Sequence, residues 1–172
     1  MKVKTSTPSS QSGFTLVELM ITISVVAFLM AIAIPSFLQT LDKRRLIGAA
    51  DNLLANLHHA QTESIKTNAQ ILTTFTEGTN WSYVVNSSPS QTTSGANYQG
   101  TSLNAVTPRV APAVLTITFD PKRGTMLQAP GAATSLITIT SALGLQLGLE
   151  VSLLSHMRIC TPNSVGGYPA CP

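Results

Sequence analysis

The segment that most constrains this chain is an apolar run near its N-terminus, residues 14–38, which contains a single charged side chain, Glu18. A bilayer core of about 30 Å is crossed by a helix of about 20 predominantly apolar residues. The run exceeds that length, so it predicts a transmembrane helix. A secretory signal is removed by a cut after its apolar region, at an Ala-x-Ala-like site. The candidates Ala31 and Ala33 are followed by Pro35, so we expect the apolar segment to be retained.

Glu18 is the residue that a simple membrane anchor does not explain. A charged side chain within a membrane helix costs about 2.5–3.5 kcal/mol on insertion scales, and such groups usually have a partner. The apolar run contains no Lys, Arg or His that would pair with it. Cleavage after Gly13 frees an α-amino group at Phe14, and this amine on an adjacent chain is a suitable partner for Glu18.

The basic character of the chain lies partly in the short polar segment before the apolar run. The formal net charge is +3. Lys2 and Lys4 contribute two of these charges, so removal of residues 1–13 lowers the net charge to +1. The overall charge is therefore weak support for a nucleic-acid partner.

A helical pattern continues beyond the apolar run over residues 39–67. Small and apolar residues recur there at intervals of three and four, the spacing of one helical face. The members of this stripe are Leu46, Ala50, Leu53, Leu57, Ala60 and Ser64. The stripe predicts that the helix packs under a following domain. A continuous helix over residues 14–67 is about 80 Å long, and Pro35 should kink it or melt a short segment, because proline removes one backbone donor.

After residue 68 the pattern changes to short β-branched or alternating segments separated by turns, which predicts a β-rich head over residues 68–172. The predicted strands cover residues 70–76, 81–85, 114–119, 125–127, 136–140, 149–153 and 157–160. Residues 86–112 are rich in Ser, Thr, Asn, Gly and Pro and are expected to be mainly loop. Gly144 and Gly148 are expected to break an apolar stretch. The predicted fold class is α+β, with a long N-terminal helix packed on an antiparallel sheet.

The two cysteines, Cys160 and Cys171, lie close together near the C-terminus. The segment between them is rich in Pro, Gly, Ser and Asn. An even number of cysteines at short spacing, in a chain with an export-type N-terminus, indicates a disulfide. The alternative is two free thiols in a loose tail. Closing so short a loop stabilises the fold by about 2–3 kcal/mol on the chain-entropy model.

The residues around the start of the apolar run resemble a known processing signal. Gly-Phe-Thr-Leu-Val-Glu-Leu at residues 13–19 is similar to the class III signal of type IV pilins and type II secretion pseudopilins. The resemblance implies that a prepilin peptidase/N-methyltransferase cuts between Gly13 and Phe14 and methylates the new amine of Phe14. Members of this superfamily carry Glu at the fifth mature position and commonly Pro at the twenty-second, which are Glu18 and Pro35 here.

The resemblance also implies an organisation and a location. The expected segments are a leader peptide at residues 1–13, a transmembrane and assembly helix at 14–38, an amphipathic continuation at 39–67 and a periplasmic head at 68–172. The implied partners are the inner membrane, which the chain crosses once, and the other pilins or pseudopilins of the filament that it later joins.

Within this superfamily the head resembles the FimT/GspH group of minor pilins and H-type pseudopilins. The resemblance rests on the Phe-Asp-Pro-Lys-Arg-Gly turn at residues 119–124 and on a terminal strand that runs into a cysteine. DNA-binding members carry Gly-Arg-x-Arg near the C-terminus, whereas residues 155–158 are Ser-His-Met-Arg. Loss of one phosphate-contacting charge weakens DNA binding and flattens its salt dependence. The candidate contacts for double-stranded DNA are Arg158, Lys122, Arg123 and Arg109, and the alternative is that these are solvated surface charges.

The sequence contains no recognisable catalytic or cofactor-binding constellation. Walker, Gly-x-Gly-x-x-Gly and Gly-x-Ser-x-Gly motifs do not occur. His58 and His59 are adjacent on a helix and point in different directions, and His156 has no neighbouring ligand cluster, so no metal site is expected. We therefore expect a subunit that is not an enzyme and holds no cofactor. The remaining hypotheses are a minor pilin of a type IV pilus, with or without DNA capture for uptake, and an H-type pseudopilin of a type II secretion system.

Overall fold

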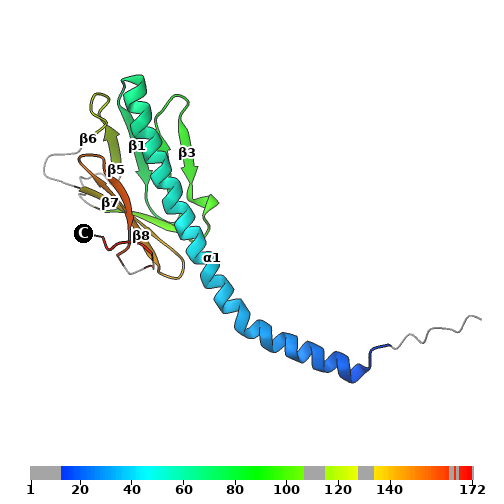
Figure 1. Cartoon of the computed structure of the whole chain (residues 1–172). Helices are drawn as coiled ribbons and strands as arrows, with labels where there is room; N and C mark the ends of the chain where they lie inside the picture. Colours follow the sequence, from blue (N-terminus) through cyan, green and yellow to red (C-terminus); the bar gives the residue numbers. More distant parts are fainter. Residues whose placement is uncertain (1–12, 107–114, 128–133, 163–164, 166, 172) are drawn as a thin grey trace, which may run out of the picture. The chain divides into compact units, whose positions relative to one another are not determined.

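The computed structural model describes residues 13–106, 115–127, 134–162, 165 and 167–171. The chain divides into two compact units, residues 1–38 and 39–172. One helix, α1 (Leu16–Thr67), contributes to both units (Figure 1). The predicted long helix is therefore confirmed, with its start two positions later than expected. It continues through Pro35 without a break in helical structure, so the predicted melting is wrong, and a kink at this residue stays a prediction.

In the second unit, one face of α1 is buried against the sheets (Figure 1). The buried residues are Asp42, Leu46, Ala49, Ala50, Leu53, Leu57, Ala60 and Ser64. Every member of the predicted stripe is among them, because a repeat of three and four residues returns each side chain to the same face of the helix. The alanines on this face let the backbone of α1 approach the sheets closely.

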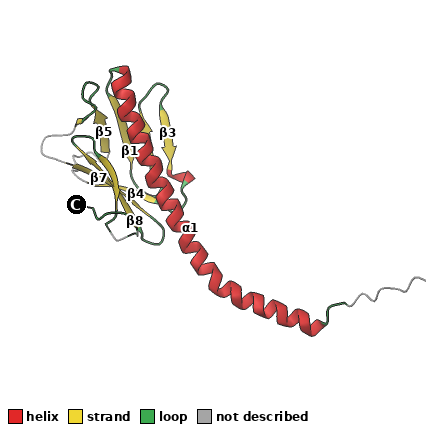
Figure 2. Cartoon of the chain, viewed as in Figure 1, coloured by secondary structure: helices red, strands yellow, loops and turns green. Residues whose placement is uncertain are grey.

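Two antiparallel sheets complete the head (Figure 2). The strands are β1 (Ile71–Thr76), β2 (Ser82–Val85), β3 (Gln91–Ser94), β4 (Ser102–Val106), β5 (Leu115–Phe119), β6 (Met126–Leu127), β7 (Thr134–Thr140), β8 (Gln146–Ser152) and β9 (Met157–Cys160). The five-stranded sheet has the order β3-β2-β1-β5-β6, and the four-stranded sheet has the order β4-β7-β8-β9. The α+β class is confirmed, but the prediction of a single sheet is wrong.

The segment predicted to be mainly loop, residues 86–112, contains β3, a short 3-10 helix (Gly95–Asn97) and β4. That prediction is wrong for a physical reason. The side chains of β3 are mostly exposed at a sheet edge, so its sequence shows no apolar alternation. Pairing with β2 holds β3 in place, and pairing with the distant β7 holds β4. Residues 107–112 lie outside the described residues.

The core of the head is built around large aromatic side chains. Phe75, Trp81 and Tyr83 are almost completely buried. Gly95 makes room for Trp81, because a Cβ at position 95 would lie 2.6 Å from the indole Nε1. The same Nε1 donates a hydrogen bond to Thr101 Oγ1 at 3.0 Å. Contacts made by the segment after β3 thus fix the principal aromatic residue of the core.

A polar network ties α1 to the five-stranded sheet. The Tyr83 hydroxyl donates to Asn52 Oδ1 at 2.6 Å and accepts from Asn56 Nδ2 at 2.7 Å. Burial raises the pKa of Tyr83 above its ordinary value, so the phenol stays neutral. Since both asparagines lie on α1, the network fixes the position of the helix along β2.

Candidate functional site

The first candidate site is the start of α1, where the processing signal was predicted. Gly13 lies just before the helix in open space, with no heavy atom within 4 Å of the position that a Cβ would occupy. Phe14 is 78% exposed. Thr15 caps the helix, because its Oγ1 accepts from the Glu18 amide at 3.2 Å and its carbonyl accepts from the Leu19 amide at 3.2 Å. The fold itself therefore does not require glycine at position 13.

Glu18 differs from the other polar side chains of this helical segment. Thr22 Oγ1 donates to the Leu19 carbonyl at 2.8 Å, and Ser24 Oγ donates to the Met20 carbonyl at 2.7 Å. Such bonds satisfy hydroxyl groups inside an apolar helix. The exposed Glu18 carboxylate forms no ion pair with any residue in the described part of the chain. Its charge therefore needs a partner from outside these residues.

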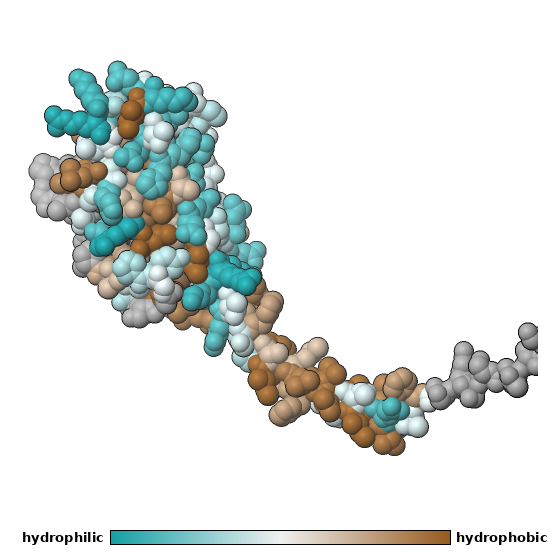
Figure 3. Space-filling model, viewed as in Figure 1, coloured by the Kyte–Doolittle hydropathy of each residue, from teal (hydrophilic) through white to brown (hydrophobic). Residues whose placement is uncertain are grey.

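The side chains of residues 16–38 present an almost wholly apolar surface (Figure 3). All of them are exposed within the single chain. The helix is long and apolar enough to cross a membrane. Removing apolar surface from water lowers the free energy by about 25 cal/mol per Å². We therefore expect lipid or other helices to cover this surface.

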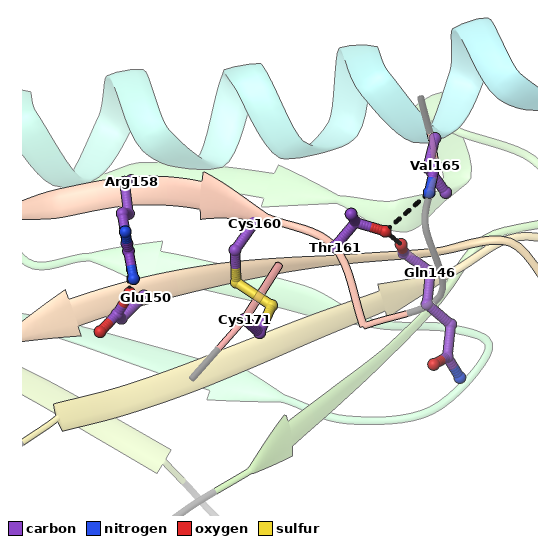
Figure 4. The surroundings of a disulfide bond; sticks show 7 residues. All are labelled: Gln146, Glu150, Arg158, Cys160, Thr161, Val165 and Cys171. Carbon is purple, nitrogen blue, oxygen red and sulfur yellow. Dashed lines mark hydrogen bonds and ion pairs between the residues drawn. A yellow bond between two sulfur atoms is a disulfide. The ribbon is translucent and has the colours of Figure 1, made fainter. Parts of the chain in front are cut away.

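The second candidate feature is the C-terminal disulfide between Cys160 and Cys171, whose Cα atoms lie 4.9 Å apart (Figure 4). The predicted pairing is confirmed. The tail also makes backbone bonds to Thr161: the Thr161 amide donates to the Pro169 carbonyl at 2.8 Å, and the Cys171 amide donates to the Thr161 carbonyl at 3.3 Å. Thr161 Oγ1 donates to the Gln146 carbonyl at 3.2 Å. The tail is thereby attached to β8 as well as to β9.

Gly148 provides the space that the disulfide occupies. It was predicted to interrupt an apolar stretch, but it lies inside β8 and pairs with Cys160 in β9. A Cβ at position 148 would lie 2.9 Å from Cys171 Sγ and 2.9 Å from Leu136 Cδ1. A glycine inside a strand often marks such a close approach of another group. Gly144, by contrast, lies in the turn before β8 with φ 81°, as expected of a turn glycine.

We expect Gly148→Ala to lower the free energy of unfolding of the head by about 1–3 kcal/mol, because the added methyl group must displace the disulfide or Leu136. Gly48→Ala is the matched control. At position 48 in α1, a Cβ makes an ordinary contact of 3.6 Å with Tyr98 Cε1, and alanine is the better helix former. Urea unfolding of the full chain in detergent, followed by the fluorescence of Trp81, measures both variants. Wild-type stability of Gly148→Ala would contradict the close packing.

A further tail residue, Tyr168, was not singled out in the sequence. Its side chain is partly buried and packs against the core of the head. Burial raises the pKa of Tyr168, and the negative charge of Asp51 on α1 raises it further. The tail thus packs against the core of the head through Tyr168. The signal in the sequence was an isolated aromatic residue in a segment rich in Pro and Gly.

The main candidate for a DNA contact, Arg158, is already paired. It lies in β9, and its Nε donates to Glu150 Oε2 on the adjacent strand β8 (Figure 4). The Glu150 side chain is 12% exposed and that of Arg158 is 43% exposed. The carboxylate offsets much of the charge that a phosphate would contact. The sequence does not reveal the partnership of Glu150 with Arg158, because which side chains face each other across two strands depends on the register.

The other candidate cations lie elsewhere in the head. Lys122 and Arg123 are exposed in the turn between β5 and β6, which belong to the other sheet. Asp120 organises this turn, since its Oδ1 accepts from the Lys122 amide at 2.9 Å. Arg109 lies outside the described residues. Lys122 and Arg123 are therefore attached to one sheet, whereas Arg158 lies in the other.

The described residues contain no group of three His, Cys, Asp or Glu side chains that could hold a metal ion. The features of the chain are instead those of a filament subunit: an exposed apolar helix with one carboxylate, a β-rich head and a disulfide-closed tail. Together they define a membrane-anchored, pilin-like protein.

Comparison with known families agrees with this class. Residues 8–34 match the family model of the prokaryotic N-terminal methylation motif. Residues 49–154 match the family model of the type II transport protein GspH. The second match covers more than half of the chain, so the chain belongs to the GspH family. No curated protein and no solved structure matches it significantly.

The two matches confirm the predicted membership of the pilin and pseudopilin superfamily. They imply processing by a prepilin peptidase and assembly with other pilins. Proteins of these families are structural subunits rather than enzymes.

Proposed function

We propose that the chain is a minor pilin of a type IV pilus and that it serves as a structural subunit needed for assembly. The observation that most supports a role as a filament subunit is the methylation motif at residues 8–34. It overlaps the exposed apolar helix that carries Glu18, a residue that forms no ion pair in the described part of the chain. In a filament, neighbouring helices cover the apolar surface. A neighbouring Phe14 amine, freed by cleavage after Gly13, supplies the cation for Glu18.

A second candidate function is that of an H-type pseudopilin in a type II secretion system. The match of residues 49–154 to the type II transport protein GspH favours it. Both candidates use the same processing and the same mode of helix packing. They differ in the filament that receives the subunit, and hence in the phenotype that follows its loss.

Deletion of the gene separates the two candidates. For the proposed minor pilin, sheared surface fractions from the deletion strain should contain few or no pili, while extracellular enzymes are secreted normally. Expression of the intact chain should restore the pili. Loss of secretion with normal piliation would overturn the pilus assignment and establish the pseudopilin.

DNA capture remains a proposal that rests on the partial motif at residues 155–158, and the Glu150 pairing makes it testable. If Arg158 contacts phosphate, Arg158→Ala should weaken binding of double-stranded DNA to the full chain and reduce the slope of log affinity against log salt by about 1. Glu150→Gln should strengthen binding, since it removes a carboxylate beside the contact. A fluorescence titration at low salt measures both changes. Unchanged binding in both variants would remove Arg158 from the DNA contacts.

A further inference from the structure

We propose that the head carries a docking surface for anionic phospholipid head groups at the end from which the chain continues into the apolar helix. This basal surface consists of Lys43, Arg44 and Arg45 on α1 and of Leu143 at the tip of the β7–β8 hairpin. It adds a membrane-surface contact to the filament function proposed above.

The three cations of the basal surface follow the apolar helix closely along the chain. The apolar run ends at Leu38, and α1 continues as a helix through Arg44. At about 1.5 Å per residue, Arg44 follows Leu38 by about 9 Å along the helix. The polar layer on each side of a bilayer core is about 5–7 Å thick. Lysine and arginine side chains extend their charged groups toward such a layer from either side, so these cations lie within reach of lipid phosphates.

The charges of the basal surface are not neutralised by acidic residues, although Arg45 Nη1 donates a hydrogen bond to the Gln99 carbonyl at 3.5 Å. Arg44 and Arg45 are exposed and Lys43 is half-buried, and within the described part of the chain none of the three forms an ion pair. The nearest acidic residue in the sequence, Asp42, is buried, and its Oδ2 accepts a hydrogen bond from the Leu143 amide at 3.4 Å. Three adjacent cations beside a membrane attract anionic lipids.

The hairpin adds an apolar group to the same surface. Leu143 is 58% exposed although it is a leucine, and the bond to Asp42 places its backbone beside α1, where the β7–β8 hairpin ends in Figure 1. The turn is well defined, because the Ser141 amide donates to the Leu145 carbonyl at 2.8 Å and the Gly144 amide donates to the Ser141 carbonyl at 3.0 Å. Basic side chains combined with an exposed apolar side chain are typical of surfaces that bind the lipid interface.

This arrangement gives the basal surface a role before assembly. Attraction to anionic lipid holds the head against the membrane while the subunit waits to enter a filament. Entry then requires that these contacts be released. Because the attraction is electrostatic, it weakens as salt shortens the Debye length, from about 10 Å at 0.1 M to about 3 Å at 1 M.

The test uses the full chain with Leu143→Cys, labelled with an environment-sensitive fluorophore. Cys160 and Cys171 are joined, so the new thiol is the only one that reacts. The protein is reconstituted into phosphatidylcholine vesicles with or without phosphatidylglycerol, and a head-group spin-labelled lipid serves as quencher. We expect stronger quenching with phosphatidylglycerol and loss of that excess at about 1 M salt. Replacing Lys43, Arg44 and Arg45 by Gln should lower the docked-to-free ratio by about fivefold per residue.

Two controls make the result specific. Leu154→Cys carries the same label at the tip of the β8–β9 hairpin, where Leu154 is 83% exposed, and its quenching should not respond to phosphatidylglycerol. A non-reducing gel shows that the Gln variant retains its disulfide, and urea unfolding followed by the fluorescence of Trp81 shows that it retains its fold. Equal quenching of the Leu143 label in both lipid mixtures overturns the proposal. If the Gln variant is quenched as before but is absent from filaments, the cations bind a neighbouring subunit and the lipid proposal also fails.

Discussion

Replacement of Gly13 by leucine is expected to leave nearly all of the protein uncleaved, with residues 1–13 still attached. The structure supplies the reason. No heavy atom lies within 4 Å of the Cβ position at residue 13, so a leucine there disturbs neither the helix nor the head. We therefore expect any need for glycine to come from the peptidase, because it must approach this backbone closely and a side chain would obstruct that approach.

The fraction of the chain that is cleaved should fall as the side chain at position 13 becomes larger. Gly13→Ala adds one methyl group and should be processed partly, whereas Gly13→Leu should not be processed. Mass spectrometry of the membrane fraction measures the ratio of the two forms, and N-terminal sequencing of the wild type should begin at Phe14. Full processing of Gly13→Leu, or a mature wild-type chain that begins at another residue, would remove the assigned cleavage site.

The sequence predicted those parts of the fold that depend on local pattern. The apolar run specifies the first part of α1 by its length and lack of charge. The stripe from Leu46 to Ser64 specifies the second part, because its spacing of three and four residues places every member on one face of a helix. Strands such as β5 and β9 alternate or are rich in β-branched residues, so they were found within one or two residues. The disulfide followed from the number of cysteines and their spacing, which do not depend on the rest of the fold.

The parts that were missed depend on partners distant in the chain. β4 has only a short alternation, Ser-Leu-Asn-Ala-Val, within a segment rich in polar residues, and it is held by pairing with the distant β7. Gly148 was predicted to interrupt an apolar stretch, but it lies within β8 and leaves space for the disulfide. Glu150 opposes Arg158 only in the register that β8 and β9 adopt. The sequence does not show that Leu143 lies beside α1, because this depends on the hydrogen bond from its amide to Asp42. Each of these features is set by tertiary contacts that a linear pattern does not contain.

Replacement of Glu18 by alanine is expected to reduce the amount of this subunit in filaments by about tenfold or more, while membrane insertion is retained. Insertion should be at least as efficient as in the wild type, because the variant lacks a charge that costs about 2.5–3.5 kcal/mol in a membrane helix. Cleavage should also be normal, since the Gly13-Phe14 junction is unchanged. The defect should therefore appear only when subunits associate.

The association defect follows from the unpaired charge. No residue in the described part of the chain forms an ion pair with Glu18, and its helix segment provides no cation. We propose that the Phe14 amine of a neighbouring subunit, which would remain basic when methylated, pairs with Glu18 and so removes both charges from the apolar environment at once. Because the two groups belong to different chains, the pair also fixes the axial offset between subunits.

Ser24→Ala is the matched control for Glu18→Ala, since it removes a polar group from the same apolar segment of α1. Ser24 already donates to the Met20 carbonyl at 2.7 Å, so its loss leaves no unpaired charge and the variant should assemble normally. Cells are fractionated, and the membrane and sheared-filament fractions are blotted for each variant. Glu18→Ala in the filament fraction at wild-type amounts would show that the proposed pairing with Phe14 is wrong. Loss of Ser24→Ala as well would show that assembly requires helix polarity in general and not the charge of Glu18.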